Sequence, residues 1–486
     1  MSKVEHGLRK NQIIKVRIDS IAAGGQGFSK FDGLSIFVDG GVPGDLAEIE
    51  LYDIRKDFAH AKIHKLLEHS DMRTEAPCRL YNVCGGCQWQ HIAYSAQLQL
   101  KTDIVKQVIR HIAGLDPDVV LPALNSPQSF HYRNKVQYPV ASPQKSTRIL
   151  AGYYKEGSHE LINIKHCPVQ PELLDAIIED SKAAAENSDI QAFVEKSHSG
   201  LLRHIIARYS FSHKEVLLTL VLNTKPESFT ALKPQLQYFA SEIMREQPAV
   251  IGVCVNFNNS RGNRILGEET KLVSGQEFII EKLVSTHESA PELLKSGLEF
   301  TLSPASFFQI NSEQAVHLLD LILDAVLQYK QAKNIERIPL ILDAYAGVAS
   351  IAMWVSALAE KVVAVEEVPD AVKNAELIIE RNGLTNVEPR CGTVEEIFPQ
   401  LLAEGMHPEI VILDPPRKGV DRKTLEHVVE LCPSRIIYVS CNPATLARDL
   451  KILKEAGYET KSVQPVDLFP QTFHVECVAI IDRQVL

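Results

Sequence analysis

The sequence predicts a multidomain α/β protein whose C-terminal part, residues 301–486, is built on a doubly wound parallel sheet. Strand-like and helix-like patterns alternate along that part, which is typical of parallel sheets with helices on both faces. Short strands between glycine-rich turns predict a small β-barrel over residues 8–68. For residues 75–300 we expect an α+β domain, which contains a group of clustered cysteines. A chain of 486 residues is long enough for three such domains.

Composition narrows the class of protein. The content of 45% hydrophobic and 23% charged residues is that of a soluble globular protein. The net charge of −10 argues mildly against a nucleic-acid partner, although a local basic face can coexist with it. The first residues show no apolar stretch of the kind found in signal peptides, and the sequence has no run of about 18 apolar residues, so we expect a cytoplasmic protein without membrane contact. Nine cysteines, an odd number, fit reduced thiols or a metal site better than a disulfide framework.

The N-terminal region predicts a small β-barrel over residues 8–68. Apolar and β-branched runs near 13–18, 35–38 and 45–52 are separated by Gly24-Gly25-Gln26-Gly27 and Gly40-Gly41. Barrels of this size bind RNA or serve as plain scaffolding, and the pattern alone does not choose between these roles. The segment resembles a TRAM domain, an RNA-binding barrel attached to RNA-modifying enzymes.

The middle region contains a cysteine cluster. Cys78, Cys84 and Cys87 form C-x5-C-G-G-C, and Cys167 follows in His-Cys-Pro-Val. Thiolates select zinc or iron–sulfur centres. Zinc prefers paired C-x2-4-C knuckles, so this three-plus-one spacing favours one [4Fe–4S] cluster, with zinc or no metal as the alternatives.

Two further features of the middle region bear on function. Residues 92–113 have the apolar spacing of an amphipathic helix. Basic residues at strand-like spacing predict contact with RNA phosphates, while a solvated strand face is the alternative for each one. These candidates are Arg133, Lys135, Arg203 and Arg208.

The C-terminal domain is predicted from its strands and from the loops that follow them. The first strand ends in Asp343-Ala344-Tyr345-Ala346-Gly347, and Glu366 ends the second, where an acid accepts from ribose hydroxyls. No second glycine follows Gly347 within the turn, so the pattern favours S-adenosylmethionine over a dinucleotide. The predicted strands are 340–342, 362–365, 387–390, 410–413, 435–439 and a closing pair near 459–468 and 474–481, with helices over 370–381 and 423–431.

Cys441 is the candidate nucleophile of this domain. It follows the buried strand 436–439, and Asn442-Pro443 predicts a helix start directly after it. A helix N-terminus lowers a thiol pKa, so the position predicts a thiolate; a buried, inert cysteine is the alternative. A thiolate that adds to pyrimidine C6 makes C5 nucleophilic. Glu476 is a candidate base for the C5 proton, or else a surface carboxylate at a strand end.

Taken together, the four cysteines, Asp343–Gly347, Asp414-Pro415-Pro416-Arg417, Ser440-Cys441-Asn442-Pro443 and His474-Val475-Glu476 resemble the RNA uracil-C5-methyltransferase family. The resemblance is closer to the TRAM-bearing, iron–sulfur group that modifies 23S ribosomal RNA. It implies a Rossmann-like methyltransferase domain with Cys441 as nucleophile, Glu476 as proton acceptor and a [4Fe–4S] cluster on the cysteines. It also implies that helix 92–113 packs on this domain and that S-adenosylmethionine is bound by Gln309, Tyr345, Glu366 and Asp414.

The resemblance favours uracil as the target base. Cytosine enzymes of related chemistry carry a second cysteine where this chain has Pro416. The expected partner is a looped or flipped uridine in RNA, bound by a monomer. The T-loop of tRNA is an alternative substrate, and a catalytically silent RNA-binding or ribosome-assembly protein is an alternative function. Many members of the family have cysteine at the position of Ala346 and glycine at the position of Ala349.

Overall fold

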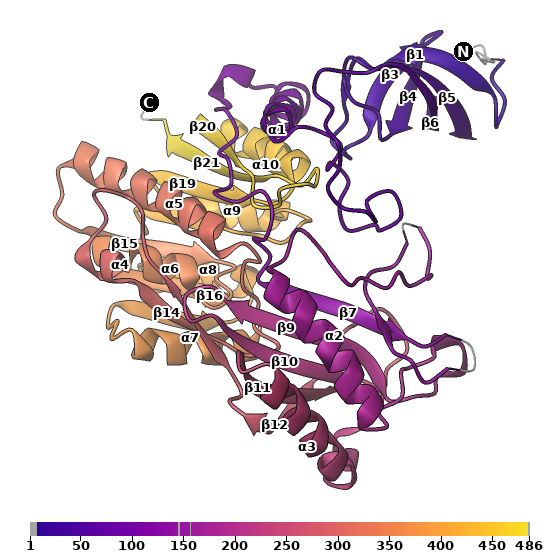
Figure 1. Cartoon of the computed structure of the whole chain (residues 1–486). Helices are drawn as coiled ribbons and strands as arrows, with labels where there is room; N and C mark the ends of the chain where they lie inside the picture. Colours follow the sequence, from indigo (N-terminus) through magenta and orange to yellow (C-terminus); the bar gives the residue numbers. More distant parts are fainter. Residues whose placement is uncertain (1–6, 144–145, 156, 485–486) are drawn as a thin grey trace.

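The computed structural model describes residues 7–143, 146–155 and 157–484. Within these ranges the chain forms sheets of six, six and seven strands in sequence order, together with a two-stranded hairpin. Figure 1 shows the N-terminal sheet at one end of the molecule, with the other two sheets below it and beside it.

The N-terminal sheet has the strand order β1-β5-β6-β4-β3-β2. Its strands alternate buried apolar and exposed residues, as in β1, where Ile14 and Val16 face inward. This period of two fills one side of the curled sheet with an apolar core. The strands are β1 (Ile13–Arg17), β2 (Ser20–Ile21), β3 (Gly27–Phe31), β4 (Leu34–Asp39), β5 (Leu46–Ile54) and β6 (Phe58–Glu68).

The central sheet has the order β12-β11-β10-β9-β7-β8, and α2 and α3 pack on it. Strand β10 is a nearly continuous apolar run that is buried on both faces. The elements are β7 (Lys135–Ala141), β8 (Leu150–Ala151), α2 (Glu172–Asn187), β9 (Leu202–Ser210), β10 (Glu215–Leu222), α3 (Phe229–Glu246), β11 (Val250–Phe257) and β12 (Glu269–Gly275). Short 3₁₀ turns lie at Pro117–Val119, Glu195–Ser197, Pro226–Ser228 and, in the last domain, Ser356–Leu358.

The C-terminal sheet has the order β17-β16-β15-β18-β19-β21-β20. The first five strands run parallel, and β21 is antiparallel to both of its neighbours. The strands are β15 (Ile338–Ala344), β16 (Ala359–Glu366), β17 (Val387–Cys391), β18 (Ile410–Leu413), β19 (Arg435–Ser440), β20 (Tyr458–Val466) and β21 (Glu476–Arg483). The α/β architecture predicted for this part is therefore present.

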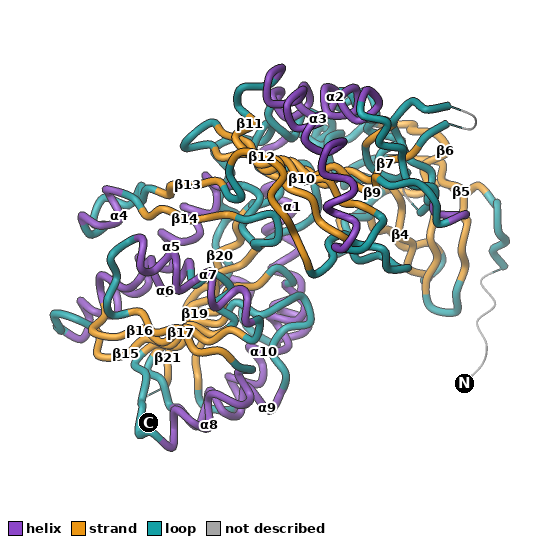
Figure 2. The backbone as a smooth tube through the Cα atoms, turned by 90° about the horizontal axis from the view of Figure 1, so that it is seen from below, coloured by secondary structure: helices purple, strands orange, loops and turns teal. Residues whose placement is uncertain are grey.

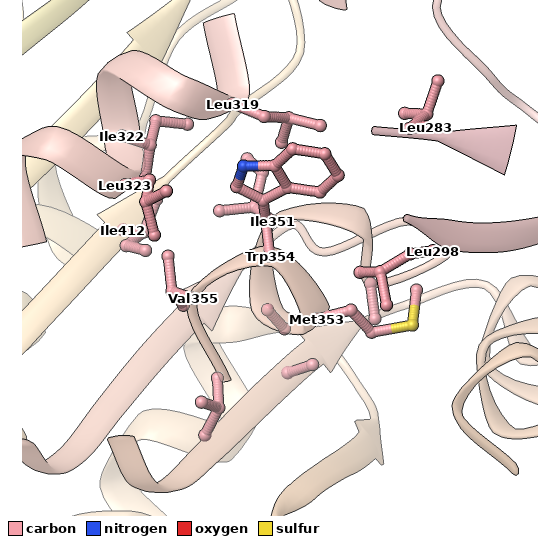
Figure 3. Packing of buried hydrophobic residues seen from close by; sticks show 14 of the residues in the cluster. Leu283, Leu298, Leu319, Ile322, Leu323, Ile351, Met353, Trp354, Val355 and Ile412 are labelled. Carbon is pink, nitrogen blue, oxygen red and sulfur yellow. The ribbon is translucent and has the colours of Figure 1, made fainter. Parts of the chain in front are cut away.

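Helices cover both faces of the C-terminal sheet. One layer contains α5, α6 and α7 and the other contains α8, α9 and α10, as Figure 2 shows with the strands between them. Trp354 lies in the first layer among Leu319, Ile351 and other apolar side chains (Figure 3). Its indole N–H donates to Asp320 Oδ1 at 3.1 Å. The helices are α5 (Ser312–Lys333), α6 (Ser350–Val355), α7 (Pro369–Arg381), α8 (Val394–Ala403), α9 (Arg422–Leu431) and α10 (Pro443–Glu455).

The hairpin of β13 (Ile279–Leu283) and β14 (Leu298–Leu302) packs with the C-terminal sheet. Its apolar residues, among them Ile279 and Phe300, belong to the same buried cluster as α5 and α6, and the short helix α4 (Glu292–Ser296) connects its strands. A domain boundary near residue 300, as expected from the sequence, would fall within β14. The hairpin and the C-terminal sheet share one apolar core.

Helix α1 (Tyr94–Val108) continues into a π-helical turn at Ile109–Ala113. Its C-terminal half, including Val105 and Val108, joins the core cluster of α10, and its N-terminal half packs beside Trp89. A fully buried ion pair joins it to the C-terminal domain: Lys101 Nζ lies 2.5 Å from Asp467 Oδ1. The helix therefore connects the N-terminal part of the chain to the last domain. No helix in the described part of the chain is both long and apolar enough to cross a membrane.

Replacing Lys101 with alanine should destabilise the protein by about 3–5 kcal/mol, because Asp467 would remain buried without its cation. Urea unfolding of the purified variant measures this loss. In the double variant Lys101→Met/Asp467→Leu no charge is left unpaired, so much of the stability should return. A single variant as stable as the double variant would contradict this interpretation.

Candidate active site

The parallel strands of the C-terminal sheet open at their carboxyl ends onto a cavity of about 1090 Å³. Ligands of doubly wound sheets bind at this edge. The structure brings all six predicted catalytic and cofactor residues to the cavity wall, namely Gln309, Tyr345, Glu366, Asp414, Cys441 and Glu476.

The turn after β15 is held in an unusual backbone conformation. Tyr345 and Ala349 have φ angles of +64° and +60°, which L-residues adopt rarely, and Gly347 between them has +57°. Asp343, fully buried at the end of β15, accepts a hydrogen bond from the Ala352 amide at 2.9 Å through Oδ2, while its Oδ1 has no partner. Burial raises the pKa of Asp343 to about 8. Tyr345, Ala346, Gly347 and Val348 of this turn line the cavity, and Asp343 is buried behind them.

Glu366 at the end of β16 fixes the same turn. Its Oε2 accepts from the Gly347 amide at 2.8 Å and its Oε1 from the Val368 amide at 2.9 Å. Each carboxylate oxygen has a second acceptor site, so Glu366 can still bind a ligand hydroxyl. The side chain therefore both shapes the turn and faces the cavity.

Asp414 is the first residue of the loop after β18 and lines the cavity. Its backbone amide donates to the Ala344 carbonyl at 3.3 Å, and burial raises the pKa of its side chain to about 6. Further along this loop, the Arg417 carbonyl accepts from Asn442 Nδ2 at 3.2 Å. This bond holds the loop against the segment that carries the candidate nucleophile.

Cys441 lies between β19 and α10, at the corner that the sequence predicts. Asn442 is the N-cap, accepting from the Ala444 amide at 3.1 Å, and Pro443 is the first helical residue. The predicted low pKa of the thiol is wrong. Burial and the negative charges of Glu476 and Asp414 raise the pKa of Cys441 to about 11, against the opposing effect of Arg417. Burial is the largest of these effects, so the position of Cys441 before a helix does not by itself set the pKa of its thiol.

Glu476 is the first residue of β21 and is 6% exposed. Burial, and then the negative charge of Asp414, raise its pKa to about 8, while Arg417 acts in the opposite direction. It is therefore a buried acid inside the cavity and differs from a solvated carboxylate at a strand end. Its neighbour Cys477 faces the other side of the strand and is fully buried in the core.

The four basic residues proposed from the sequence as RNA contacts lie elsewhere. Arg208 is 2% exposed and donates to the Ser306 carbonyl at 2.5 Å. Arg203 is 7% exposed and donates to two backbone carbonyls of the 258–260 loop. The expectation of surface phosphate contact is therefore corrected for these two arginines. Lys135 is half-buried, with its pKa lowered to about 7 by burial and by the neighbouring arginines, and Arg133 faces the cysteines described next.

The four predicted metal ligands come together at a second, smaller cavity. Cys78, Cys84, Cys87 and Cys167 all line a space of about 30 Å³ between the loop at 78–90 and the segment before α2, and Arg133 lines it with them. Among the described residues, no three His, Cys, Asp or Glu side chains are close enough to hold a single metal ion. The four thiols therefore line one common space.

Some cavity residues were not proposed individually from the sequence. Arg417 supplies the positive charge that acts on both Cys441 and Glu476, and its place in the Asp-Pro-Pro-Arg motif is the signal that could have identified it. Phe307, 72% exposed, and His474 line the mouth of the cavity, and both stand beside residues that were proposed. An exposed aromatic ring at a cavity mouth suits stacking against a planar ligand.

This fold and cavity define an α/β enzyme with a nucleotide-type cofactor site next to a thiol and a carboxylic acid. A family model described as tRNA (uracil-5-)-methyltransferase matches residues 267–484. An uncharacterised RNA methyltransferase of Bacillus cereus is 36% identical, and another of Gloeobacter violaceus is 37% identical; in each comparison the alignment covers 99% of both chains. The Pyrococcus abyssi tRNA (uracil-54, C5)-methyltransferase, solved with S-adenosyl-L-homocysteine, is similar at a TM-score of 0.72 and 26% identity. The match covers 96% of this chain and 99% of that one. The chain belongs to the family of these RNA methyltransferases, and its C-terminal part matches the tRNA (uracil-5-)-methyltransferase model.

Proposed function

We propose that this protein methylates C5 of a uridine in RNA, with S-adenosylmethionine as methyl donor. The observation that carries the proposal is one cavity lined by a thiol, Cys441, a buried acid, Glu476, and the loops at the carboxyl ends of β15, β16 and β18. Uracil C5 methylation requires a nucleophile for C6, a base for C5 and a methyl donor beside both.

The residues around the first turn suit the donor. Glu366 has free acceptor sites for ribose hydroxyls, and Asp343 has a buried oxygen without a partner. Tyr345, Gln309 and Asp414 line the rest of this part of the cavity. When bound, S-adenosylmethionine supplies a methyl group on a positively charged sulfur, and buried acids favour that charge.

The two candidate catalytic groups act on opposite ends of one double bond. The Cys441 thiolate forms a bond to uracil C6, and the electron pair of the C5=C6 bond makes C5 nucleophilic. C5 gains the methyl group as the bond from that methyl to the donor sulfur breaks and the donor is left as a neutral thioether. Glu476 then removes the C5 proton, the C5=C6 bond re-forms and the thiolate leaves. The positive charge of Arg417 favours the thiolate in this sequence.

The pH dependence should report Glu476. Burial raises its pKa to about 8, so the carboxylate needed as a base increases as pH rises towards that value. We expect kcat/KM, measured with RNA and donor both subsaturating, to rise with pH through the Glu476 pKa near 8, and to go on rising more shallowly above it as the Cys441 thiol, whose pKa is about 11, becomes thiolate. A profile that is flat from about pH 6 to 9 would contradict this assignment.

For the substrate we propose 23S ribosomal RNA, because the chain resembles the barrel-bearing, cysteine-cluster group of the family. A tRNA T-loop is the second candidate, since the Pyrococcus abyssi relative, whose chain is almost fully covered by the match, is a tRNA (uracil-54, C5)-methyltransferase. Parallel reactions with labelled S-adenosylmethionine and each purified RNA, followed by nucleoside analysis, test the proposal. 5-Methyluridine from rRNA alone supports the first substrate, and from tRNA alone the second. Label only in 5-methylcytidine or methyladenosine would contradict the uracil assignment.

We further propose that the four cysteines hold a [4Fe–4S] cluster and that the N-terminal sheet is a TRAM-like RNA-binding barrel. The four cysteines line one small cavity, and their three-plus-one spacing suits one four-iron cluster better than the paired knuckles that zinc prefers. Protein purified without oxygen should therefore absorb broadly in the visible range, and Cys167→Ala should lose that absorbance. Cys254→Ala, a buried cysteine outside this cavity, is the matched control. Metal analysis that finds zinc alone would contradict the cluster.

A further inference from the structure

We propose that Asn134 is a positioning residue that makes the donor site depend on the four-cysteine cavity. The inference rests on the proposed cofactor and cluster. Residues 131–134 lie between the segment that carries Cys167 and the segment that carries Gln309, and they are hydrogen-bonded to both. A change at the cysteines is thereby transmitted to a wall of the active-site cavity.

On the cysteine side the contact is made by backbone and by one cation. The His131 amide donates to the Pro168 carbonyl and the Arg133 amide to the Val169 carbonyl, each at 2.9 Å. The Arg133 side chain lines the cavity with the four thiols, and its guanidinium carbon lies 5.9 Å from the centre of the Tyr153 ring. A cluster bound by four thiolates carries negative charge, which this cation would balance. The position of residues 131–133 therefore depends on what the cavity holds.

On the donor side the contact is made by Asn134, which is 2% exposed. Its amide donates to the Ile310 carbonyl at 2.8 Å, and its Nδ2 donates to the Gln309 carbonyl at 2.8 Å and to Ser312 Oγ at 2.9 Å. Gln309 lines the large cavity, and Ser312 begins α5. One buried side chain thus fixes both the cofactor residue and the start of the helix behind it.

A second connection supports the same dependence. The amides of Gln88 and Trp89, which follow Cys87, both donate to the Gln471 carbonyl, at 3.1 and 3.0 Å. Gln471 is 3% exposed and lies in the loop whose residues Phe469 and His474 line the large cavity next to Glu476. The two cysteine-bearing segments therefore hold two different walls of the active site.

The test measures binding of S-adenosylhomocysteine by calorimetry to the full chain, with the cluster intact and after its removal by chelation. We expect removal to weaken binding to the wild type about tenfold, within the usual range of coupling between sites. With its cluster intact, Asn134→Ala should keep the visible absorbance of the wild type and bind about tenfold more weakly. Its KM for S-adenosylmethionine should rise while kcat at saturation stays near the wild-type value. In this variant, cluster removal should have little further effect.

Gln137→Ala, three residues along β7 and half-buried, is the matched control and should behave as the wild type in every assay. Wild-type binding that does not change when the cluster is removed from folded protein would overturn the proposal. An Asn134→Ala protein that binds like the wild type would also overturn it, and so would a chain that assembles no cluster. If cluster removal unfolds the protein, the binding affinity of Asn134→Ala with its cluster intact decides the test: wild-type affinity overturns the proposal and about tenfold weaker binding supports it.

These results are separable from the proposed function. Cluster-dependent binding of S-adenosylhomocysteine in a protein that methylates a base other than uracil would leave the inference standing and remove the uracil assignment. Formation of 5-methyluridine together with cluster-independent binding would support the uracil assignment and overturn the inference about Asn134.

Discussion

Cys441→Ala should abolish 5-methyluridine formation, lowering the rate by roughly 10⁴- to 10⁶-fold, as removal of an attacking nucleophile does in other enzymes. Without the thiol no bond forms to uracil C6, and C5 stays a poor carbon nucleophile. The alanine side chain fits the space of the half-buried cysteine, so folding and binding of S-adenosylhomocysteine should not change. Product analysis by mass spectrometry, with calorimetry of the same samples, measures both effects.

Cys432→Ala is the control for this experiment, because Cys432 is an exposed cysteine at the end of α9 in the same domain. Its activity should match that of the wild type. Retention of more than about a hundredth of wild-type activity by Cys441→Ala would be incompatible with a covalent mechanism through this residue.

Glu476→Gln should accumulate a covalent protein–RNA adduct. The thiolate can still add to C6 and C5 can still gain a methyl group, but no base removes the C5 proton, so the Cys441–C6 bond persists. On a denaturing gel the variant should migrate as a slower band after incubation with RNA and S-adenosylmethionine, and nuclease treatment should return the band to its original position. Glu459→Gln, an exposed glutamate on β20, is the matched control and should give no such band.

The same variant should be more stable than the wild type at alkaline pH. The pKa of Glu476 rises from its usual 4.5 to about 8 on folding, so the folded state holds this proton more tightly than the unfolded state. Its contribution to stability is full below pH 4.5 and is lost as pH rises towards 8. A neutral glutamine removes this loss, so the difference in Tm between variant and wild type should grow from pH 6 to 8.5. A Tm difference that is the same at pH 6 and at pH 8.5 would indicate that folding does not raise the pKa of Glu476.

The sequence predicted the parallel sheet well because each strand is a short apolar run bounded by turn signals. Residues 410–413 are predicted as a strand and form β18 with the same bounds, and the strand predicted at 435–439 differs from β19 by one residue. The carboxyl ends of parallel strands meet at one edge, so the loops at Asp343, Asp414 and Cys441 could be placed together from sequence.

Properties that depend on long-range packing could not be predicted in this way. Arg203 and Arg208 have the spacing of a surface strand, but their side chains are buried against the 258–260 loop and Ser306, more than 50 residues away in sequence. The pKa of Cys441 was predicted from its own helix, whereas Glu476, from a distant strand, contributes to raising it. Both predictions used only nearby residues in the sequence, whereas the residues that contact these side chains are distant in the sequence.

The central claim is that the sulfur of Cys441 bonds to uracil C6, and trapping with RNA that contains 5-fluorouridine tests it most directly. Fluorine at C5 leaves no proton to remove, so the methylated adduct cannot break down. Tryptic digestion and mass spectrometry should find the peptide 436–448, which contains Cys441, carrying one methylated fluorouridine nucleotide. The adduct on any other cysteine, or an unmodified peptide from protein that methylates ordinary RNA, would contradict the account.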